Sequence, residues 1–202
     1  MAPGAKRPGA APGFTGKLRI IGGIWRSRRL SFPERAGLRP TPDRVRETLF
    51  NWLQPWLPGS KCLDLFAGSG ALGIEALSRG AHSVVLVEND PVSARALRTN
   101  LDLLAAHAAE LVHADARAFL QSTVRPFDIV FLDPPYQGGL LAECCARLET
   151  GGWVRPHGLI YLEAASDQAP LLPLAWTLLR SKRAGQVGYY LAQNTGNNCG
   201  SL

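Results

Sequence analysis

The sequence has no long hydrophobic run, no paired cysteine motif and no cluster of histidines. No apolar stretch approaches the ~20 residues that cross a bilayer, so we expect no membrane partner. The four cysteines form no Cys-x-x-Cys pair, which argues against a zinc site or a disulfide framework and indicates reduced thiols in the cytoplasm. The four histidines are scattered, and no metal site is predicted.

The N-terminal segment, residues 1–16, is rich in Ala, Pro and Gly and lacks the apolar region of a signal peptide. We expect it to be a disordered tail and assign it no function. Residues 194–202 are polar, and we expect them to be flexible as well. A chain of 202 residues is long enough to bury the core of one ordinary domain, for which a monomer is the simple expectation.

Positive charge is concentrated near the N-terminus. Residues 1–46 carry a net charge of +9, and the remaining residues carry −3. A basic arm on a mildly acidic body predicts a polyanionic partner that binds through the arm. For Lys6 and Arg7 a solubilising tail is the alternative, whereas the later basic residues lie in patterned sequence.

Residues 18–21 and 24–30 are predicted to form two short strands of a basic β-ribbon. Two glycines separate the segments, and both segments contain arginine. A helix with an apolar face follows, and Thr41 or Asp43 is placed to cap it. We expect residues 17–59 to form an N-terminal extension of the main domain.

Strands and helices alternate from residue 60 to residue 193. The strands are continuous apolar runs, which is typical of a parallel sheet covered by helices on both faces. Right-handed crossovers would build a Rossmann-like, doubly wound α/β sheet that ends in a hairpin. The predicted strands are Cys62–Phe66, Ser83–Val87, Glu110–His113, Phe127–Leu132, Leu159–Leu162, Trp176–Arg180 and Val187–Ala192. The predicted helices are Ala71–Arg79, Pro91–Ala106, Ala116–Ser122 and Gly139–Leu148.

A glycine-rich loop follows the first of these strands, at the edge where open α/β sheets bind ligands. Gly68 and Gly70 let the backbone bend and approach a ligand, and Gly73 allows close helix packing. A dinucleotide site is the alternative. However, Asp64 would repel a pyrophosphate, whereas it would attract the ammonium group of S-adenosylmethionine (SAM). The loop therefore predicts a SAM site.

Two more acids follow the next strands. Glu88 is placed to accept the ribose hydroxyls of SAM, with a solvated strand end as the alternative. Asp115 is placed to accept from the adenine amine beside Ala116, and a helix N-cap is an equal alternative.

The string Asp133-Pro134-Pro135-Tyr136 ends the fourth strand of this domain. An exocyclic amine of a nucleobase is a poor nucleophile because its lone pair is delocalised into the ring. The Asp133 carboxylate and the Pro134 carbonyl would accept its N–H bonds, and Tyr136 would stack on the flipped base. Attack on the SAM methyl then depends on positioning and electrostatics, without a metal.

These motifs together resemble the RsmD family of bacterial methyltransferases, which modify the N2 amine of guanine 966 in 16S ribosomal RNA (rRNA). The resemblance spans residues 17–193, and residues 37–53 are its most discriminating part. It implies a SAM-dependent fold with seven strands, the last antiparallel, and a ribbon that contacts rRNA. The matching segments are Leu18–Gly23, Gly37–Leu53, Asp64–Gly73, Asp133–Tyr136 and Gly185–Tyr189.

Motif matching then implies three sets of site residues. The catalytic set is Asp133, Pro134 and Tyr136. The SAM-binding set is Asp64, Phe66, Gly68, Gly70, Glu88, Asp115 and Ala116. The RNA-binding set is Arg19, Trp25, Arg26, Arg28, Arg29, Arg39 and Arg44. For Arg44 and Glu47 a contact with SAM is an alternative, and Arg44 or Arg46 could pair with Glu47 or Asp43 on the helix surface.

Two other functions compete with this one. DNA adenine methyltransferases also use an Asp-Pro-Pro-Tyr string but usually carry a target-recognition domain, and the 57 residues up to Gln193 are needed for the sheet. An inactive RNA-binding factor predicts a damaged site, whereas every expected polar position is filled. The choice of guanine N2 over adenine N6 rests on the resemblance. We expect the assembled 30S subunit, rather than bare rRNA, to be the substrate.

Overall fold

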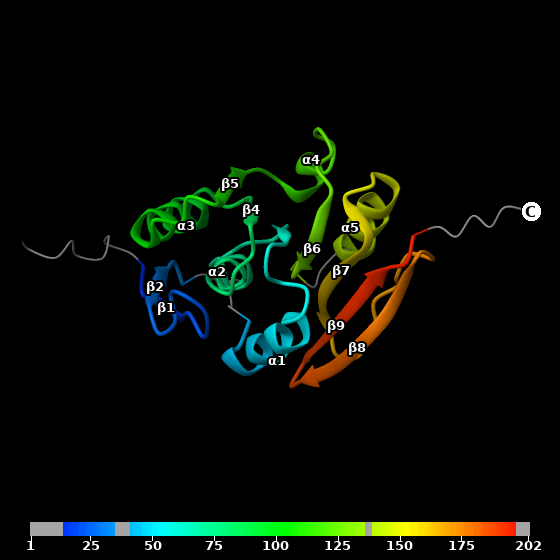
Figure 1. Cartoon of the computed structure of the whole chain (residues 1–202), viewed down its shortest axis with the longest axis horizontal. Helices are drawn as coiled ribbons and strands as arrows, with labels where there is room; N and C mark the ends of the chain where they lie inside the picture. The colour runs from blue at the N-terminus through cyan, green and yellow to red at the C-terminus, as the bar shows by residue number, and fades with distance from the viewer. Residues whose placement is uncertain (1–13, 35–40, 136–138, 197–202) are drawn as a thin grey trace, which may run out of the picture.

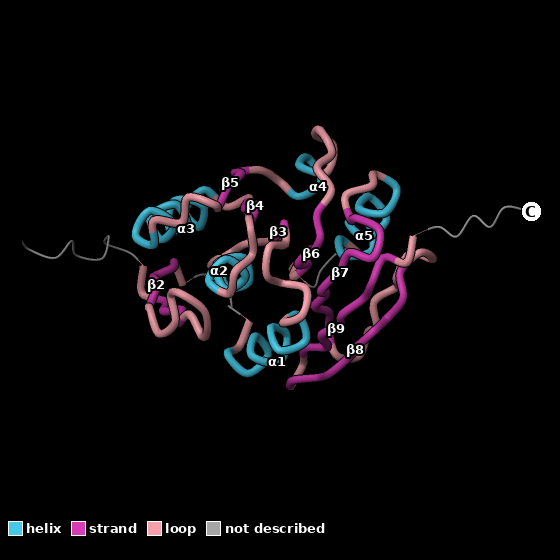
Figure 2. Tube along the Cα trace, in the orientation of Figure 1, coloured by secondary structure: helices cyan, strands magenta, loops and turns pink. Residues whose placement is uncertain are grey.

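The computed structural model describes residues 14–34, 41–135 and 139–196. These residues form a two-stranded sheet and a seven-stranded sheet with helices on both faces (Figures 1 and 2). The small sheet is an antiparallel ribbon of β1 (Gly16–Arg19) and β2 (Arg29–Phe32), and α1 (Asp43–Leu53) follows it. None of the helices in these ranges is long and apolar enough to span a membrane.

The large sheet has the strand order β5-β4-β3-β6-β7-β9-β8. Strands β3 to β7 are parallel, and β9 runs antiparallel between β7 and β8. The expected doubly wound sheet with an antiparallel last strand is confirmed. Its strands are β3 (Lys61–Asp64), β4 (Ser83–Glu88), β5 (Ala109–His113), β6 (Phe127–Leu132), β7 (Val154–Ala165), β8 (Trp176–Ala184) and β9 (Val187–Asn194). The helices of this part are α2 (Ala71–Ser78), α3 (Pro91–Leu104), α4 (Ala116–Phe119) and α5 (Leu140–Thr150).

Side chains of the strands pack into two hydrophobic layers, one on each face of the sheet. Leu86 and Phe131 lie in the layer under α1, α2, α3 and the ribbon, whereas Val87 and Leu132 lie in the layer under α4 and α5. Successive side chains of a strand point to opposite faces. A continuous apolar run therefore supplies both layers at once, which explains the strand pattern in the sequence.

The ribbon and α1 share the first of these layers. Leu18, Leu30 and Phe50 are buried in the same cluster as the strands of the large sheet. Trp52 of α1 also stacks on Tyr189 of β9, with 5.5 Å between the ring centroids. Burying one large apolar side chain stabilises a fold by roughly 1.5–3 kcal/mol. These contacts therefore hold the ribbon and α1 firmly on the sheet.

Two local predictions for this region are wrong. The ribbon is present, but its strands overlap the expected segments only at residues 18–19 and 29–30, because residues 20–28 form the turn between them. Neither Thr41 nor Asp43 caps α1; Pro42 holds the cap position, and no side chain accepts a hydrogen bond there. The Thr41 hydroxyl instead lies 2.8 Å from Glu163, and Asp43 binds arginines. Partners distant in sequence therefore take both side chains away from the helix end.

Arg46 of α1 is buried, with 1% of its surface exposed. Its Nη2 lies 2.6 Å from Asp43 Oδ1, and its Nη1 lies 3.4 Å from Glu75 Oε2. The anticipated pairing with Asp43 is confirmed, but it does not lie on the helix surface. Arg46 also donates to the backbone carbonyls of Arg19 and Thr41, at 2.9 and 3.2 Å. The guanidinium thereby joins β1, the segment before α1 and α2.

Glu75 of α2 receives several donors from this region. The backbone N–H groups of Ile21 and Gly22 each donate to its carboxylate at 2.8 Å. Arg79, the C-cap residue of α2, donates from Nε at 2.7 Å. A buried carboxylate is tolerated when it is hydrogen-bonded and paired with cations in this way. Glu75 thus attaches the ribbon turn to the helix that follows the glycine loop.

Glu75→Gln should destabilise the fold strongly, because it removes the carboxylate charge beside the buried Arg46. Removing one partner of a buried pair costs about 3–5 kcal/mol, and urea denaturation would measure the loss of unfolding free energy. Glu110→Gln is the matched control, since Glu110 pairs with Arg125 at the surface and should cost less than about 1 kcal/mol. Equal losses in the two variants would contradict the role assigned to Glu75.

Candidate active site

Acidic side chains gather at the carboxyl ends of the parallel strands. Asp64 ends β3, Glu88 ends β4, Asp133 directly follows β6, and Glu163 lies near the end of β7. Because β3, β6 and β7 are neighbours in the sheet, Asp64, Asp133 and Glu163 meet at one edge. This is the edge at which open α/β sheets bind their ligands.

The glycine loop between β3 and α2 makes a bend that glycine permits. Gly68 and Gly70 have φ angles of 52° and 80°, in the left-handed region that other residues avoid. The Gly70 N–H donates to the Ala67 carbonyl at 2.7 Å and closes the turn. A Cβ on Gly73 would lie 2.6 Å from Leu86, so the expected close packing of α2 on the sheet is confirmed.

Asp64 is a buried acid, with 2% of its surface exposed. Its Oδ2 accepts the Gly73 N–H at 2.9 Å. Burial raises the pKa of Asp64 from 3.8 to about 7, with a further increase from the charge of Glu88 and against the lowering effect of the Gly73 hydrogen bond. A cationic group brought beside Asp64 would favour its ionised form.

Glu88 and Asp115 both bind backbone N–H groups. Glu88 accepts from Gly68 and from Asp90, each at 2.7 Å, and so holds the glycine loop against β4. Asp115 caps α4 by accepting from Arg117 at 2.8 Å and from Ala118 at 3.3 Å. The N-cap interpretation of Asp115 is confirmed. A carboxylate offers about four acceptor positions, so both residues keep acceptor capacity for a ligand.

Thr41 and Glu163 are two site residues that the sequence-based prediction missed. Glu163 is buried, and its Oε1 accepts from the hydroxyls of Thr41 at 2.8 Å and of Tyr161 at 2.9 Å. The Thr41 hydroxyl also lies 3.4 Å from Asp133 Oδ2. Glu163 follows the apolar run Leu159–Leu162 within β7, which is the same signal that marked Asp64 and Asp133. Nothing in the local sequence marks Thr41, because its partners are distant in the chain.

The carboxylates of Asp133 and Glu163 influence each other. Burial raises the pKa of Asp133 well above 3.8, and the charges of Glu163 and Asp64 raise it further, while the Thr41 hydroxyl lowers it. Burial also raises the pKa of Glu163, against the hydrogen bonds from Thr41 and Tyr161. Like charges repel strongly where water is excluded, so the pair retains a proton to higher pH than an exposed acid.

The remaining predicted residues fall into two regions. Pro134 is buried next to Asp133, and Phe66 and Ala116 pack against the second hydrophobic layer, whereas Tyr136 lies outside the described residues. In the RNA-binding set, Trp25 is partly buried against the first layer, Arg39 lies outside the described residues, and the exposed members are Arg19, Arg26, Arg28, Arg29 and Arg44.

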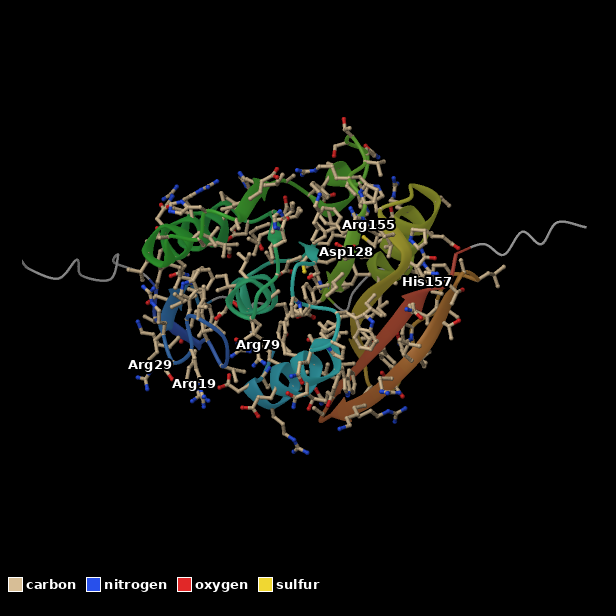
Figure 3. All side chains as sticks on the ribbon, viewed as in Figure 1. Arg19, Arg29, Arg79, Asp128, Arg155 and His157 are labelled. Carbon is tan, nitrogen blue, oxygen red and sulfur yellow. The ribbon has the colours of Figure 1, made fainter. Side chains whose placement is uncertain are left out.

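Arg19 and Arg29 of the ribbon strands are exposed to solvent. Figure 3 shows Arg19 and Arg29 pointing away from the body of the protein. Arg19 pairs with Asp43 at 3.0 Å, and Arg28 donates to the Leu103 carbonyl at the end of α3 at 2.9 Å. Within the described parts of the chain, His, Cys, Asp and Glu side chains form no group that could hold a metal ion.

Comparison with known proteins decides the family. A family model described as "Conserved hypothetical protein 95" matches residues 18–193. The chain belongs to this family. It is 50% identical over 180 residues to ribosomal RNA small subunit methyltransferase D of Escherichia coli (strain K12), covering 89% of this chain and 91% of that protein. It is 46% identical over 187 residues to the Haemophilus influenzae protein of the same name, covering 91% and 97%. The resemblance to the RsmD family is therefore confirmed.

Solved structures agree with this assignment. The structure described as a putative methyltransferase yhhF from Escherichia coli is 50% identical, with a TM-score of 0.83, and the match covers 89% of this chain and 98% of that one. An RNA methyltransferase from Salinibacter ruber, solved with S-adenosyl-L-homocysteine, is 17% identical with a TM-score of 0.61, covering 81% of this chain and 99% of that one. This second likeness concerns the fold alone.

The raised pKa of Asp64 predicts that the stability difference between wild type and Asp64→Asn changes with pH. The folded chain holds the Asp64 proton up to about pH 7, and the unfolded chain only to about pH 4. The contribution of Asp64 to the wild-type unfolding free energy should therefore fall across this interval as pH rises. Relative to wild type, Asp64→Asn should gain on the order of a few kcal/mol between pH 4 and pH 8, measured by urea denaturation.

Asp102→Asn is the control for this experiment, because Asp102 is exposed on α3. As a surface substitution, it should stay within about 0.5 kcal/mol of wild type at each pH. A pH-independent difference for Asp64→Asn would show that Asp64 titrates normally, and it would contradict the prediction.

Proposed function

We propose that this protein transfers a methyl group from SAM to the N2 amine of guanine 966 of 16S rRNA, in the assembled 30S subunit. The observation that carries the proposal is the position of Asp133 directly after β6, beside Asp64 of β3 and Glu163 of β7. The names of the relatives with 50% and 46% identity support the rRNA substrate. Guanine 966 itself comes from the family resemblance.

The residues at the ends of β3, β4 and β5 suit SAM as the cofactor. The buried Asp64 would bind the ammonium group, since its raised pKa makes a cationic neighbour favourable. Glu88 would accept the ribose hydroxyls, Asp115 and Ala116 would contact the adenine, and the open backbone at Gly68 and Gly70 would let the ligand approach. SAM would supply the methyl group from its sulfonium sulfur.

Asp133 would act on the nucleophile. Its carboxylate would accept one N–H of the guanine N2 amine and the Pro134 carbonyl the other, which orients the nitrogen lone pair toward the methyl. The raised pKa makes Asp133 a suitable acceptor for the proton that the methylated amine loses. Stacking of the base on Tyr136 completes the proposal.

The DNA alternative is less consistent with the chain. After the Asp-Pro-Pro-Tyr string, the described residues 139–196 are used by α5, β7, β8 and β9. These elements complete the sheet, and no segment among them is inserted as a separate unit for reading duplex DNA. The proposed substrate is therefore RNA whose target base is presented by its own structure.

Methyl transfer tests the proposal directly. Labelled SAM would be offered to 30S subunits that lack the modification, to free 16S rRNA and to duplex DNA. We expect label in the subunit as N2-methylguanine, and Asp133→Ala should reduce the rate by roughly 10²–10⁴-fold. Asp102→Asn, an exposed change on α3, is the control and should retain the rate.

The other outcomes of this assay are equally informative. Label in DNA alone would transfer the function to the DNA alternative. SAM binding without any methyl transfer would indicate an inactive binding factor. Methylation of bare rRNA as efficient as that of subunits would reject the assembled particle as the preferred substrate.

Glu163→Gln should shift the pH dependence of this activity. Asp133 must be ionised to accept the amine, so kcat/KM should fall as pH drops through its raised pKa. The charge of Glu163 is one cause of the raised pKa of Asp133. Without this charge the pKa of Asp133 falls, so the acid limb of the pH profile should move to lower pH. The amide oxygen can still accept from Thr41 and Tyr161.

The control for this profile is Glu110→Gln, a charge change at the opposite end of the strands, where Glu110 pairs with Arg125. It should leave the acid limb in place. An acid limb that stays unchanged in Glu163→Gln would mean that a group other than the Asp133–Glu163 pair governs the pH dependence.

A further inference from the structure

We propose that the exposed cations of β8 form a second surface for the RNA backbone, on the side of the active site opposite the ribbon. The surface is the active-site half of the edge strand β8, where Arg180 and Lys182 project from one face and Arg183 projects from the other. These three residues are called the β8 basic surface below. The proposal rests on the proposed function, since it assigns a further contact to the same substrate. None of these residues belongs to the RNA-binding set derived from the sequence.

The hairpin of β8 and β9 is more basic than the residues that precede it. Residues 176–194 carry a net charge of +3 and contain no acid, whereas residues 47–175 carry −6. All three side chains are exposed, and none forms an ion pair with an acid in the described ranges. Exposed cations that are not paired with acids attract a polyanion.

Sheet topology places these cations at the active-site edge. Both β7 and β8 are antiparallel to β9, so β8 runs in the same direction as β7, and its carboxyl end lies at the ligand-binding edge. In register, Glu163 pairs with Tyr189, and Tyr189 pairs with Lys182. With strands about 4.8 Å apart, the Lys182 backbone lies about 10 Å from that of Glu163.

The ribbon and β8 lie on either side of Asp133. In the sheet order, β6 is central, β8 is the edge strand, and the ribbon packs near α3 on the side of β5 and β4 (Figure 1). When a flipped base lies at Asp133, the RNA strand that carries it leaves the site in two directions. The ribbon arginines would meet the backbone on one side, and the β8 basic surface would meet it on the other.

Protection of the sheet edge is the other explanation for these cations, since edge strands often carry lysine to prevent pairing with another chain. Their position argues against it. The first half of β8, Trp176 to Leu179, has no charge and exposes 46% of Leu178, and the cations are confined to the half nearest the active site. A protective function would cover the apolar half as well.

The experiment compares two triple variants that lose the same charge. Arg180→Gln, Lys182→Gln and Arg183→Gln together remove the β8 basic surface. The control combines Lys61→Gln, Arg125→Gln and Arg155→Gln, which lie near the amino ends of the strands; Figure 3 shows Arg155 beside its partner Asp128 there. Binding to 30S subunits and to protein-free 16S rRNA is measured over a series of salt concentrations, with SAM affinity as the check on folding.

Each phosphate contact contributes about 0.7–0.9 to the slope of log affinity against log salt concentration. We expect the β8 variant to lose about 2 to 3 from that slope on both substrates, and on the order of tenfold to a hundredfold in affinity at about 0.15 M salt. The control should keep the wild-type slope. Arg180→Lys with Arg183→Lys, which preserves charge, should keep it too.

Three results would overturn the proposal. An unchanged slope in the β8 variant would show that the surface does not touch RNA, and equal losses in both triple variants would show an effect of net charge alone. Loss of affinity for the subunit, with affinity for protein-free rRNA retained, would assign the surface to an acidic protein. Failure of the proposed function would give a different result, namely no methyl transfer by the wild-type protein.

Discussion

The buried carboxylate of Glu75 is the interaction on which the arrangement of the N-terminal half depends. It lies on α2, the helix that follows the glycine loop, and accepts donors from the ribbon turn, from α1 and from α2 itself. An unpaired charge in this position would be very unfavourable. Docking of the ribbon and α1 therefore stabilises α2, and the loop geometry is linked to the placement of the ribbon.

A second set of acids lies at the carboxyl ends of the parallel strands, and Thr41 and Arg46 connect it to Glu75. Asp64, Asp133 and Glu163 meet where three parallel strands end, and burial raises the pKa of each. Such a cluster opposes folding, because like charges are brought together away from water. Natural proteins keep this kind of destabilisation where a site needs it. The hydroxyls of Thr41 and Tyr161 offset part of the cost by donating to Glu163.

Much of the fold and the core of the site could be predicted from the sequence, because both follow from one topological rule. Parallel strands place their carboxyl ends together, so acids that follow apolar runs, such as Asp64 and Asp133, must meet. Local reasoning failed where a partner is distant in the chain. Thr41 is a residue type that often caps a helix, and it stands just before α1. Its hydroxyl instead binds Glu163 of β7, a partner that no local pattern indicates.

The sequence-based prediction also missed the cations grouped on β8. A net charge summed over residues 47–202 is negative, and the sum hides the three cations of β8 among the acids of the other elements. Their grouping depends on β8 being the edge strand and on its direction. Both properties arise from pairing between strands, which composition does not contain.

The position of β9 has a consequence for how the protein is made. The last strand among the described residues, β9, lies between β7 and β8, and it also carries Tyr189, on which Trp52 of α1 stacks. While the chain is still being synthesised, β7 and β8 have no strand between them, and one side of α1 has no partner. Pairing that joins distant segments forms late. A growing chain therefore reaches its native sheet only after residue 194 has left the ribosome.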